Sequence, residues 1–315
     1  MKRPSFLALV GPTASGKTEL ACEIAKHLPV EVISCDSMQV YRDMPHLTQA
    51  PSAKAVKILR AHLVSFLDLS EEYNAALFRR DALTLIEQIL KRGRIPLIVG
   101  GTGLYLRALL DGLFENENSL AGGKDETYRK KLLAQQEKHG GNYLHEKLKK
   151  VDAVSSLKIH PNDFRRLIRA LEIFHMTGQP FSAQKQNREG IRGKFFHRMY
   201  LLNRDRADLY GRINRRVDRM LEDGLLAEVK KLQKKKLSQT AMMALGFREM
   251  CAHLEGRMTL PEALELLRKN TRHYAKRQLS WFRHERDVQT ISVAQNDTAK
   301  ASADKILKDW EHAAA

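Results

Sequence analysis

The sequence predicts an α/β protein in which helices flank a parallel sheet, with an additional all-helical domain inserted into the chain. Two observations support this. Short runs of apolar and β-branched residues alternate with longer segments of helical periodicity, which is typical of a parallel sheet. Between residues 113 and 195 the helical periodicity continues without a convincing strand. We therefore expect a core made of residues 1–112 and 196–315, and a helical insertion made of residues 113–195.

The first part of the core contains three expected strands. Segments of helical periodicity follow them; in TELACEIAKHL (18–28), for example, the apolar residues fall on one helical face. In parallel sheets of this kind, ligands bind beyond the carboxyl ends of the strands, so the residues that follow the strands should meet at one edge. The expected strands are SFLALV (5–10), PVEVIS (29–34) and the strand within RIPLIVGG (94–101).

The rest of the chain returns to the sheet once. The polar, glycine-containing segment ENENSLAGGKDE (115–126) is typical of a linker into the insertion. After the insertion, FFHRMYLLN (195–203) is the expected fourth strand, and we expect long helices over the remainder of the chain.

Residues 11–18, GPTASGKT, form the most specific motif. They follow the first strand, open the first helix and match the pattern G-x-x-x-x-G-K-[ST]. Glycines in this pattern let backbone N–H groups approach phosphate oxygens, while Lys17 neutralises them and the Thr18 hydroxyl binds Mg²⁺. The motif predicts a P-loop NTPase-like core but does not identify the phosphate ester. The expected phosphate-binding residues are Gly11, Pro12, Thr13, Ala14, Ser15, Gly16, Lys17 and Thr18.

Other features of nucleotide-hydrolysing proteins are weak. A hydrophobic strand that ends in a Mg²⁺-linked aspartate is offered only by LVSFLD with Asp68, and no guanine-reading Asn-Lys-x-Asp is convincing. Asp36 follows the second strand and should lie beside the phosphate loop. The residues leave two alternatives: a kinase that phosphorylates a compound held by Asp36, or an enzyme whose leaving group is a diphosphate held by the loop.

The net charge of +17 indicates a polyanionic partner. In segment 268–286, aromatic residues are interleaved with arginines and lysines, as in Tyr274, Trp281 and Phe282. This mixture suits single-stranded or loop RNA, because bases stack on aromatic rings while cations hold phosphates, although such aromatic residues are also typical of a core. No segment has the ~20 apolar residues of a membrane span, so we expect a cytoplasmic protein, and we expect it to be a monomer.

Eight motifs occur in a fixed order along residues 6–286: GPTASGKT, ISCDSMQVYRDM, FRRDA, GGTGLYLRALL, HPNDFRRLIRALEI, LYGRINRRVDRML, ALGFREM and TRHYAKRQLSWFR. Together they resemble the bacterial tRNA dimethylallyltransferases, also called tRNA isopentenyltransferases. The resemblance implies transfer of a dimethylallyl group from dimethylallyl diphosphate to N6 of adenosine 37, beside the anticodon, in tRNAs that read codons starting with U. The phosphate loop would then hold a prenyl diphosphate in place of ATP.

The resemblance also implies roles for individual residues. Asp36 matches the general base, which accepts a proton as adenine N6 attacks the allylic carbon. Lys17, Thr18 through Mg²⁺, and Arg216 match the groups that stabilise the departing diphosphate. Arg212 lies four residues before Arg216 on the expected helix, so the two arginines can converge on one anion.

Further positions match segments that contact tRNA in this family. Thr13 and Thr102 would line the channel where the two substrates meet, which the target base enters by leaving its stack. The insertion at 113–195 would clamp the anticodon stem-loop. The matching tRNA contacts are Asp36, Ser37, Met38, Gln39, Thr102, Arg129, Arg165, Arg166, Leu167, Ile168, Arg169, Met243, Gly246, Arg248, Lys276, Arg277, Gln278, Trp281 and Arg283.

The chain departs from the family pattern at three places. The family usually reads Gly-Thr-x-Lys-Pro where this chain has LTQAP (47–51), and His-His-Leu-x-Asp where it has AHLVS (61–65). Segment 115–125 replaces the usual Leu-Pro-x-Ala-Asp. These changes affect turn geometry and positioning contacts but leave the chemistry residues intact. The alternatives to prenyl transfer are a small-molecule kinase and a non-catalytic RNA-binding protein with a relic phosphate loop.

Overall fold

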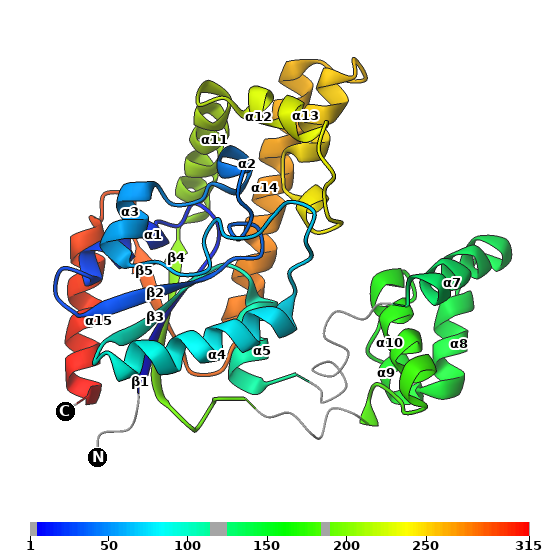
Figure 1. Ribbon diagram of the computed structural model, residues 1–315, viewed down its shortest axis with the longest axis horizontal. Helices are drawn as coiled ribbons and strands as arrows, with labels where there is room; N and C mark the ends of the chain where they lie inside the picture. The colour runs from blue at the N-terminus through cyan, green and yellow to red at the C-terminus, as the bar shows by residue number, and fades with distance from the viewer. Residues whose placement is uncertain (1–4, 114–124, 184–189, 315) are drawn as a thin grey trace. The chain divides into compact units, whose positions relative to one another are not determined.

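The computed structural model describes residues 5–113, 125–183 and 190–314. The chain divides into two compact units (Figure 1). One consists of Met1–Leu109 and Arg192–Ala315, and the other consists of Leu110–Ile191. The second unit corresponds to the predicted insertion, with boundaries a few residues before 113 and 195; most of the departure at 115–125 lies outside the described residues.

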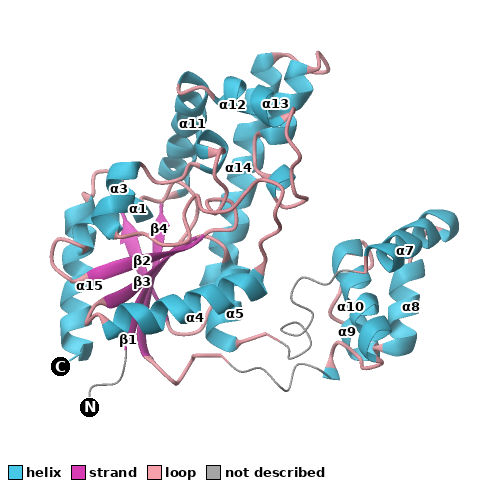
Figure 2. Cartoon of the chain, viewed as in Figure 1, coloured by secondary structure: helices cyan, strands magenta, loops and turns pink. Residues whose placement is uncertain are grey.

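The first unit is built around a five-stranded sheet in which all neighbouring strands are parallel (Figure 2, magenta). The strand order is β2-β3-β1-β4-β5. The α/β prediction and the four predicted strands are therefore confirmed. The strands are β1 (Ser5–Val10), β2 (Val30–Cys35), β3 (Ile95–Gly100), β4 (Phe196–Arg204) and β5 (Val288–Val293).

The expectation of helices alone after the fourth strand is wrong at β5. This strand pairs only with β4, at the edge of the sheet. In VQTISV only Val293 is fully buried, so the run lacks the continuous apolar character that marks a strand covered on both faces.

Helices cover both faces of the sheet. Because successive strand residues point to opposite faces, Leu7 and Leu9 share one face, where they pack with α1 (Lys17–Ile24) and α15 (Ala299–Ala314). On the other side, α4 (Ala75–Lys91) contacts β2 and β3, and its Phe78 ring stacks on Tyr105 of α5 (Gly103–Asp111) with centroids 4.8 Å apart. The buried sheet thus provides a rigid support for the loops at its carboxyl edge.

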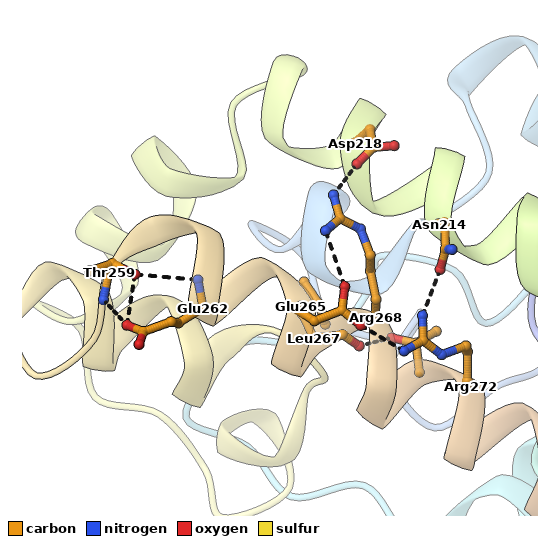
Figure 3. Close-up of polar contacts among 9 residues, drawn as sticks. Asn214, Asp218, Thr259, Glu262, Glu265, Leu267, Arg268 and Arg272 are labelled. Carbon is orange, nitrogen blue, oxygen red and sulfur yellow. Dashed lines mark hydrogen bonds and ion pairs between the residues drawn. The ribbon is translucent and has the colours of Figure 1, made fainter.

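Two long helices, α11 (Arg206–Glu222) and α14 (Leu260–Arg283), pack against each other beyond the sheet (Figure 1). Figure 3 shows that Arg268 and Arg272 of α14 reach α11. Arg268 Nη2 donates to Asp218 Oδ1 at 2.5 Å, and Arg272 Nη1 donates to Asn214 Oδ1 at 3.0 Å. Both arginines also bind Glu265. Part of the basic segment 268–286 therefore joins two helices.

The remaining short helices of this unit connect the larger elements. At the start of α14, Thr259 and Glu262 form a reciprocal capping box, in which Thr259 N donates to Glu262 Oε2 at 2.8 Å (Figure 3). The short elements are α2 (Pro45–Thr48), α3 (Ala53–Leu59), α12 (Leu225–Leu232), the 3₁₀ helix η2 (Ala241–Met243) and α13 (Phe247–Leu254).

The second unit contains only helices among its described residues. Its own apolar core includes Leu132, Leu144 and Leu167. The carboxylate of Glu172, fully buried, accepts hydrogen bonds from Arg129 and Arg169 at 2.6–2.7 Å. Burial alone would raise the pKa of Glu172, but the hydrogen bonds from these two arginines lower it. The helices are α7 (Glu126–His139), α8 (Tyr143–Val151), α9 (Ala153–Ser156) and α10 (Phe164–Thr177).

Candidate active site

The phosphate loop lies between β1 and α1, at the carboxyl edge of the sheet. Gly16, with a φ of 98°, precedes α1 in a left-handed conformation and supplies no side chain to cap it. The N–H groups of the first helical turn are therefore open to an anion. The Lys17 ammonium folds over the loop and donates to the carbonyls of Gly11 and Pro12 at 3.0 and 2.7 Å. The loop thus presents a cation and backbone donors together, as its sequence predicts.

Arg216 brings a second cation to the loop from α11. Its Nη1 donates to Thr13 Oγ1 at 2.8 Å. Burial lowers the pKa of Arg216 to about 10 and that of Lys17 to about 8, while the nearby charge of Asp36 raises both. The two cations and the carboxylate therefore lie close enough to sense one another. Both cations remain mainly protonated at pH 7.

Asp36 follows β2 and faces the loop. Its Oδ1 accepts hydrogen bonds from the N–H groups of Met38 and Gln39, at 2.9 and 3.3 Å, which fixes the orientation of the carboxyl group. Among the described residues no donor binds its other oxygen, Oδ2. That oxygen is therefore available to accept a proton from a ligand.

The turn after β3 completes this edge of the site. The Thr102 hydroxyl accepts a hydrogen bond from Ser37 N at 3.0 Å, which joins the turn to the segment that carries Asp36. The close approach of β2 and β3 requires a glycine before this turn, because a Cβ added to Gly100 would lie 2.1 Å from the Cys35 carbonyl oxygen. As predicted from the strand order, the residues after β1, β2 and β3 meet at one edge.

Two residues of α14, one turn apart, close the site from the helical side. The buried side chain of Gln278 accepts from Thr13 N at 2.8 Å and donates to the Gly101 carbonyl at 2.9 Å, so it bridges the two loops. The Tyr274 phenol lies beside Asp36 and Thr102, and burial, followed by the Asp36 charge, raises its pKa. From the sequence, Tyr274 was expected either to stack on a base or to lie in a core, although its spacing of four from Gln278 places both on one helical face.

Arg212 supports the backbone of the loop. Its Nε donates to the Ala14 carbonyl at 2.8 Å, and Arg204 Nε donates in the same way to the Ser15 carbonyl at 2.8 Å. Arg212 and Arg216 thus converge on adjacent residues of the loop, as their spacing suggests. The nearby Ser15 hydroxyl is fully buried and has no hydrogen-bond partner among the described residues.

The residues at this edge are suited to Mg²⁺ in the presence of a phosphate group. Mg²⁺ usually takes one or two protein oxygens together with substrate phosphate oxygens and water. The Thr18 hydroxyl, at the start of α1, makes no hydrogen bond to any described residue and can supply such a ligand. No cluster of three His, Cys, Asp or Glu side chains suited to a metal occurs in the described ranges. Asp68, the aspartate that the sequence offered as a Mg²⁺ ligand, is exposed, and its carboxylate accepts a hydrogen bond from Ser70 N.

Several of the predicted tRNA contacts are accessible. Ser37, Met38 and Gln39 are partly exposed beside Asp36. Met243, before α13, is also exposed, and so are several cationic side chains on α10, α13 and α14. The exposed cations among the predictions are Arg165, Arg166, Arg248, Lys276, Arg277 and Arg283.

Four other predicted contacts are buried in the structure. The side chains of Leu167 and Ile168 lie in the core of the second unit, with 0% and 6% exposure, so they are not presented to RNA on its surface. Gln278 is buried and occupied in bridging two loops. Gly246 is buried with a φ of 97° at the start of α13, where an added Cβ would lie 3.1 Å from Leu47 Cδ2.

Three further predicted contacts have internal partners. Arg129 and Arg169 bind Glu172, with side chains 22% and 29% exposed. The guanidinium of Arg107 covers the Trp281 ring at 4.4 Å from its centroid. One face of this ring is therefore not open to a base. Contact of these residues with RNA stays a prediction.

Comparisons with known proteins identify relatives along nearly the whole chain. A family model for IPP transferase matches residues 39–285, and one for isopentenyl transferase matches residues 4–69. The chain is 42% identical over 304 residues to the tRNA dimethylallyltransferase of Carboxydothermus hydrogenoformans, covering 96% of this chain and 95% of the relative. It is also 42% identical to that of Halalkalibacterium halodurans, with 95% and 94% covered.

Solved structures agree with these relatives. The tRNA isopentenylpyrophosphate transferase of Bacillus halodurans has a TM-score of 0.69 and 40% identity, with 99% of this chain and 98% of that chain covered. A eukaryotic dimethylallyltransferase acting on tRNA has a TM-score of 0.81 and 29% identity, with 98% and 79% covered. Within the part of the chain that the structure describes, no helix has the length and apolar character to cross a membrane.

Proposed function

Because the chain belongs to the IPP transferase family, we propose that it transfers a dimethylallyl group from dimethylallyl diphosphate to N6 of adenosine 37, beside the anticodon of tRNAs that read codons starting with U. The observation that carries this proposal is the grouping of Lys17, Arg216 and Asp36 at one edge of the sheet. It places two cations for a diphosphate beside a carboxylate for a proton. The comparisons give no support to the kinase alternative.

In the proposed reaction, the N6 atom of adenine forms a bond to the allylic carbon while the bond from that carbon to the diphosphate oxygen breaks. The proton on N6 passes to Asp36 Oδ2, whose partner oxygen is held by two backbone N–H groups. General base catalysis of this kind contributes typically about 10²–10⁴-fold to a rate. The diphosphate leaves with both electrons of the broken bond.

The departing diphosphate gains negative charge, which Lys17, Arg216 and the N–H groups of the loop are placed to stabilise. Thr18 would hold Mg²⁺, which would supply further positive charge beside the diphosphate when it is bound. The Tyr274 phenol of α14 lies near the Asp36 carboxylate and Thr102.

The tRNA is proposed to bind as a single stem-loop to a monomer of the protein in the cytoplasm. A buried site requires the target adenine to leave its stack, and the exposed cations named above can hold the backbone on either side of it. The helical unit would contribute Arg165 and Arg166 to this hold and clamp the anticodon stem.

Label transfer tests the proposal. Dimethylallyl diphosphate labelled in the prenyl group is incubated with Mg²⁺ and an unmodified anticodon stem-loop that contains A36 and A37, beside a matched stem-loop with G at position 37. Label should pass to the first RNA only, and Asp36→Asn should abolish nearly all of it. Transfer of phosphate from γ-labelled ATP to a small acceptor, with no prenyl transfer, would replace the proposal by the kinase alternative.

A further inference from the structure

We infer that Gln49 is a positioning residue for Arg216, holding its guanidinium toward the diphosphate. This inference rests on the proposed function and concerns the segment 47–51, in which this chain lacks the glycine and lysine that the related family usually has. Gln49 occupies the position that the family pattern leaves open, between Thr48 and Ala50.

The Gln49 side chain forms two hydrogen bonds that fix its orientation. Its Nε2 donates to the His46 carbonyl at 2.9 Å, and its Oε1 accepts from Arg216 Nε at 3.1 Å. A carbonyl can only accept and a guanidinium can only donate, so the reversed amide would face both partners with the wrong group. The network therefore assigns the acceptor atom of Gln49 to Arg216.

With this contact, Arg216 is held at two of its three nitrogens. Nε is bound to Gln49, Nη1 is bound to Thr13, and Nη2 has no partner among the described residues. A guanidinium is planar, so two fixed nitrogens define the direction of the third. Nη2 is left for an oxygen of the diphosphate. Gln49 is neutral, so it orients the cation without cancelling its charge.

A buried carboxylate holds Gln49 in place through the backbone of α2. Glu228 of α12 is 8% exposed and accepts from His46 N at 2.9 Å and from Leu47 N at 2.8 Å. His46 and Leu47 belong to α2, which ends just before Gln49. Gln49 itself has left-handed backbone angles, with a φ of 50°. Gln39 Nε2 also donates to the Gln49 carbonyl at 3.3 Å.

Leu47, at the position where the family usually has glycine, anchors the same turn by packing. Its side chain is 6% exposed and lies against Gly246, where no Cβ competes for the space. The departure at Leu47 therefore bears on the position of Gln49. Leu47 and Glu228 hold the turn, and the turn presents Gln49 to Arg216.

A double-mutant cycle on the affinity for inorganic diphosphate tests this inference. Isothermal titration at pH 7 with Mg²⁺ would compare the wild type, Gln49→Ala, Arg216→Ala and the double variant. Gln88→Ala, which removes an exposed amide on α4, is the matched control. Melting temperatures check that each variant folds, and stem-loop affinity is measured in parallel.

Loss of one hydrogen bond to a charged group should lower diphosphate affinity about tenfold in Gln49→Ala. The same change should have no effect in the Arg216→Ala background, and it should leave stem-loop affinity unchanged. An equal loss in both backgrounds, no loss at all, or a matching loss of stem-loop affinity would overturn the inference. So would failure of the wild type to bind diphosphate.

The proposed function is tested separately. Diphosphate binding does not require prenyl transfer, so coupling between Gln49 and Arg216 without transfer of label to RNA would contradict the reaction and leave the positioning role intact.

Discussion

Raising the pH from 7 to 9 removes the Lys17 proton from most molecules of the free protein, because burial lowers the pKa of this ammonium to about 8. The charged fraction falls from about nine tenths at pH 7 to about one tenth at pH 9. Only the charged form neutralises a phosphate oxygen at the Gly11–Thr18 loop. We therefore expect kcat/KM for dimethylallyl diphosphate to be nearly constant below pH 7 and to fall about tenfold between pH 7 and pH 9.

The assay measures initial rates of label transfer at saturating stem-loop RNA and constant ionic strength. The matched variant is Lys17→Arg, whose guanidinium keeps its charge throughout this range. Its rate should be lower at pH 7 but independent of pH up to 9. If kcat/KM of the wild type stays constant up to pH 9, or falls equally in Lys17→Arg, the charge of Lys17 does not limit the rate.

Three further predictions concern the base and the helical unit. Asp36→Asn should lower kcat by about 10²–10⁴-fold with little change in stem-loop affinity, because it removes the proton acceptor but keeps the shape; single-turnover rates and filter binding check this. Leu167→Ala should destabilise the helical unit by about 2–5 kcal/mol in urea unfolding, whereas Arg166→Ala, on the same helix but exposed, should stay within about 0.5 kcal/mol. Glu172→Gln should cost about 3–5 kcal/mol, since it leaves Arg129 and Arg169 without their buried carboxylate, and a melting temperature equal to the wild type would contradict this.

Much of the core could be predicted because its signals are local. The strands β1 and β3 are continuous apolar runs, and the phosphate loop has a fixed spacing between a strand and a helix. Strand order then places the residues after β1, β2 and β3 at one edge, so the approach of Asp36 and Thr102 to the loop follows from topology. β5 escaped prediction because an edge strand with exposed positions lacks such a run.

The helical contributions to the site were harder to predict, since a sequence segment does not say which face of its helix meets which partner. In the basic segment of α14, Tyr274 and Gln278 face the site while Lys276 and Arg277 face solvent. In α10, Leu167 lies in the core although arginines precede it. A motif that is expected to contact RNA therefore also contains residues that hold the helix in place.

Gln49 illustrates a third limit. It occupies a position that the family pattern leaves open, so no motif assigns it a role, and its contact with Arg216 joins positions 167 residues apart. Glu228 of α12 holds the turn that bears Gln49 through the backbone of α2. Long-range contacts of single side chains carry no periodic signal in the sequence.

In the proposed reaction, the phosphate loop holds a prenyl diphosphate whose allyl group is transferred to one adenine. Mass analysis of nucleosides from an unmodified tRNA, digested after incubation with the protein, Mg²⁺ and dimethylallyl diphosphate, tests this reaction. We expect the adenosine at position 37, and no other, to carry a dimethylallyl group in place of one N6 hydrogen, with release of one diphosphate for each. An unmodified adenosine 37 in the presence of bound tRNA and bound diphosphate would contradict the proposed reaction.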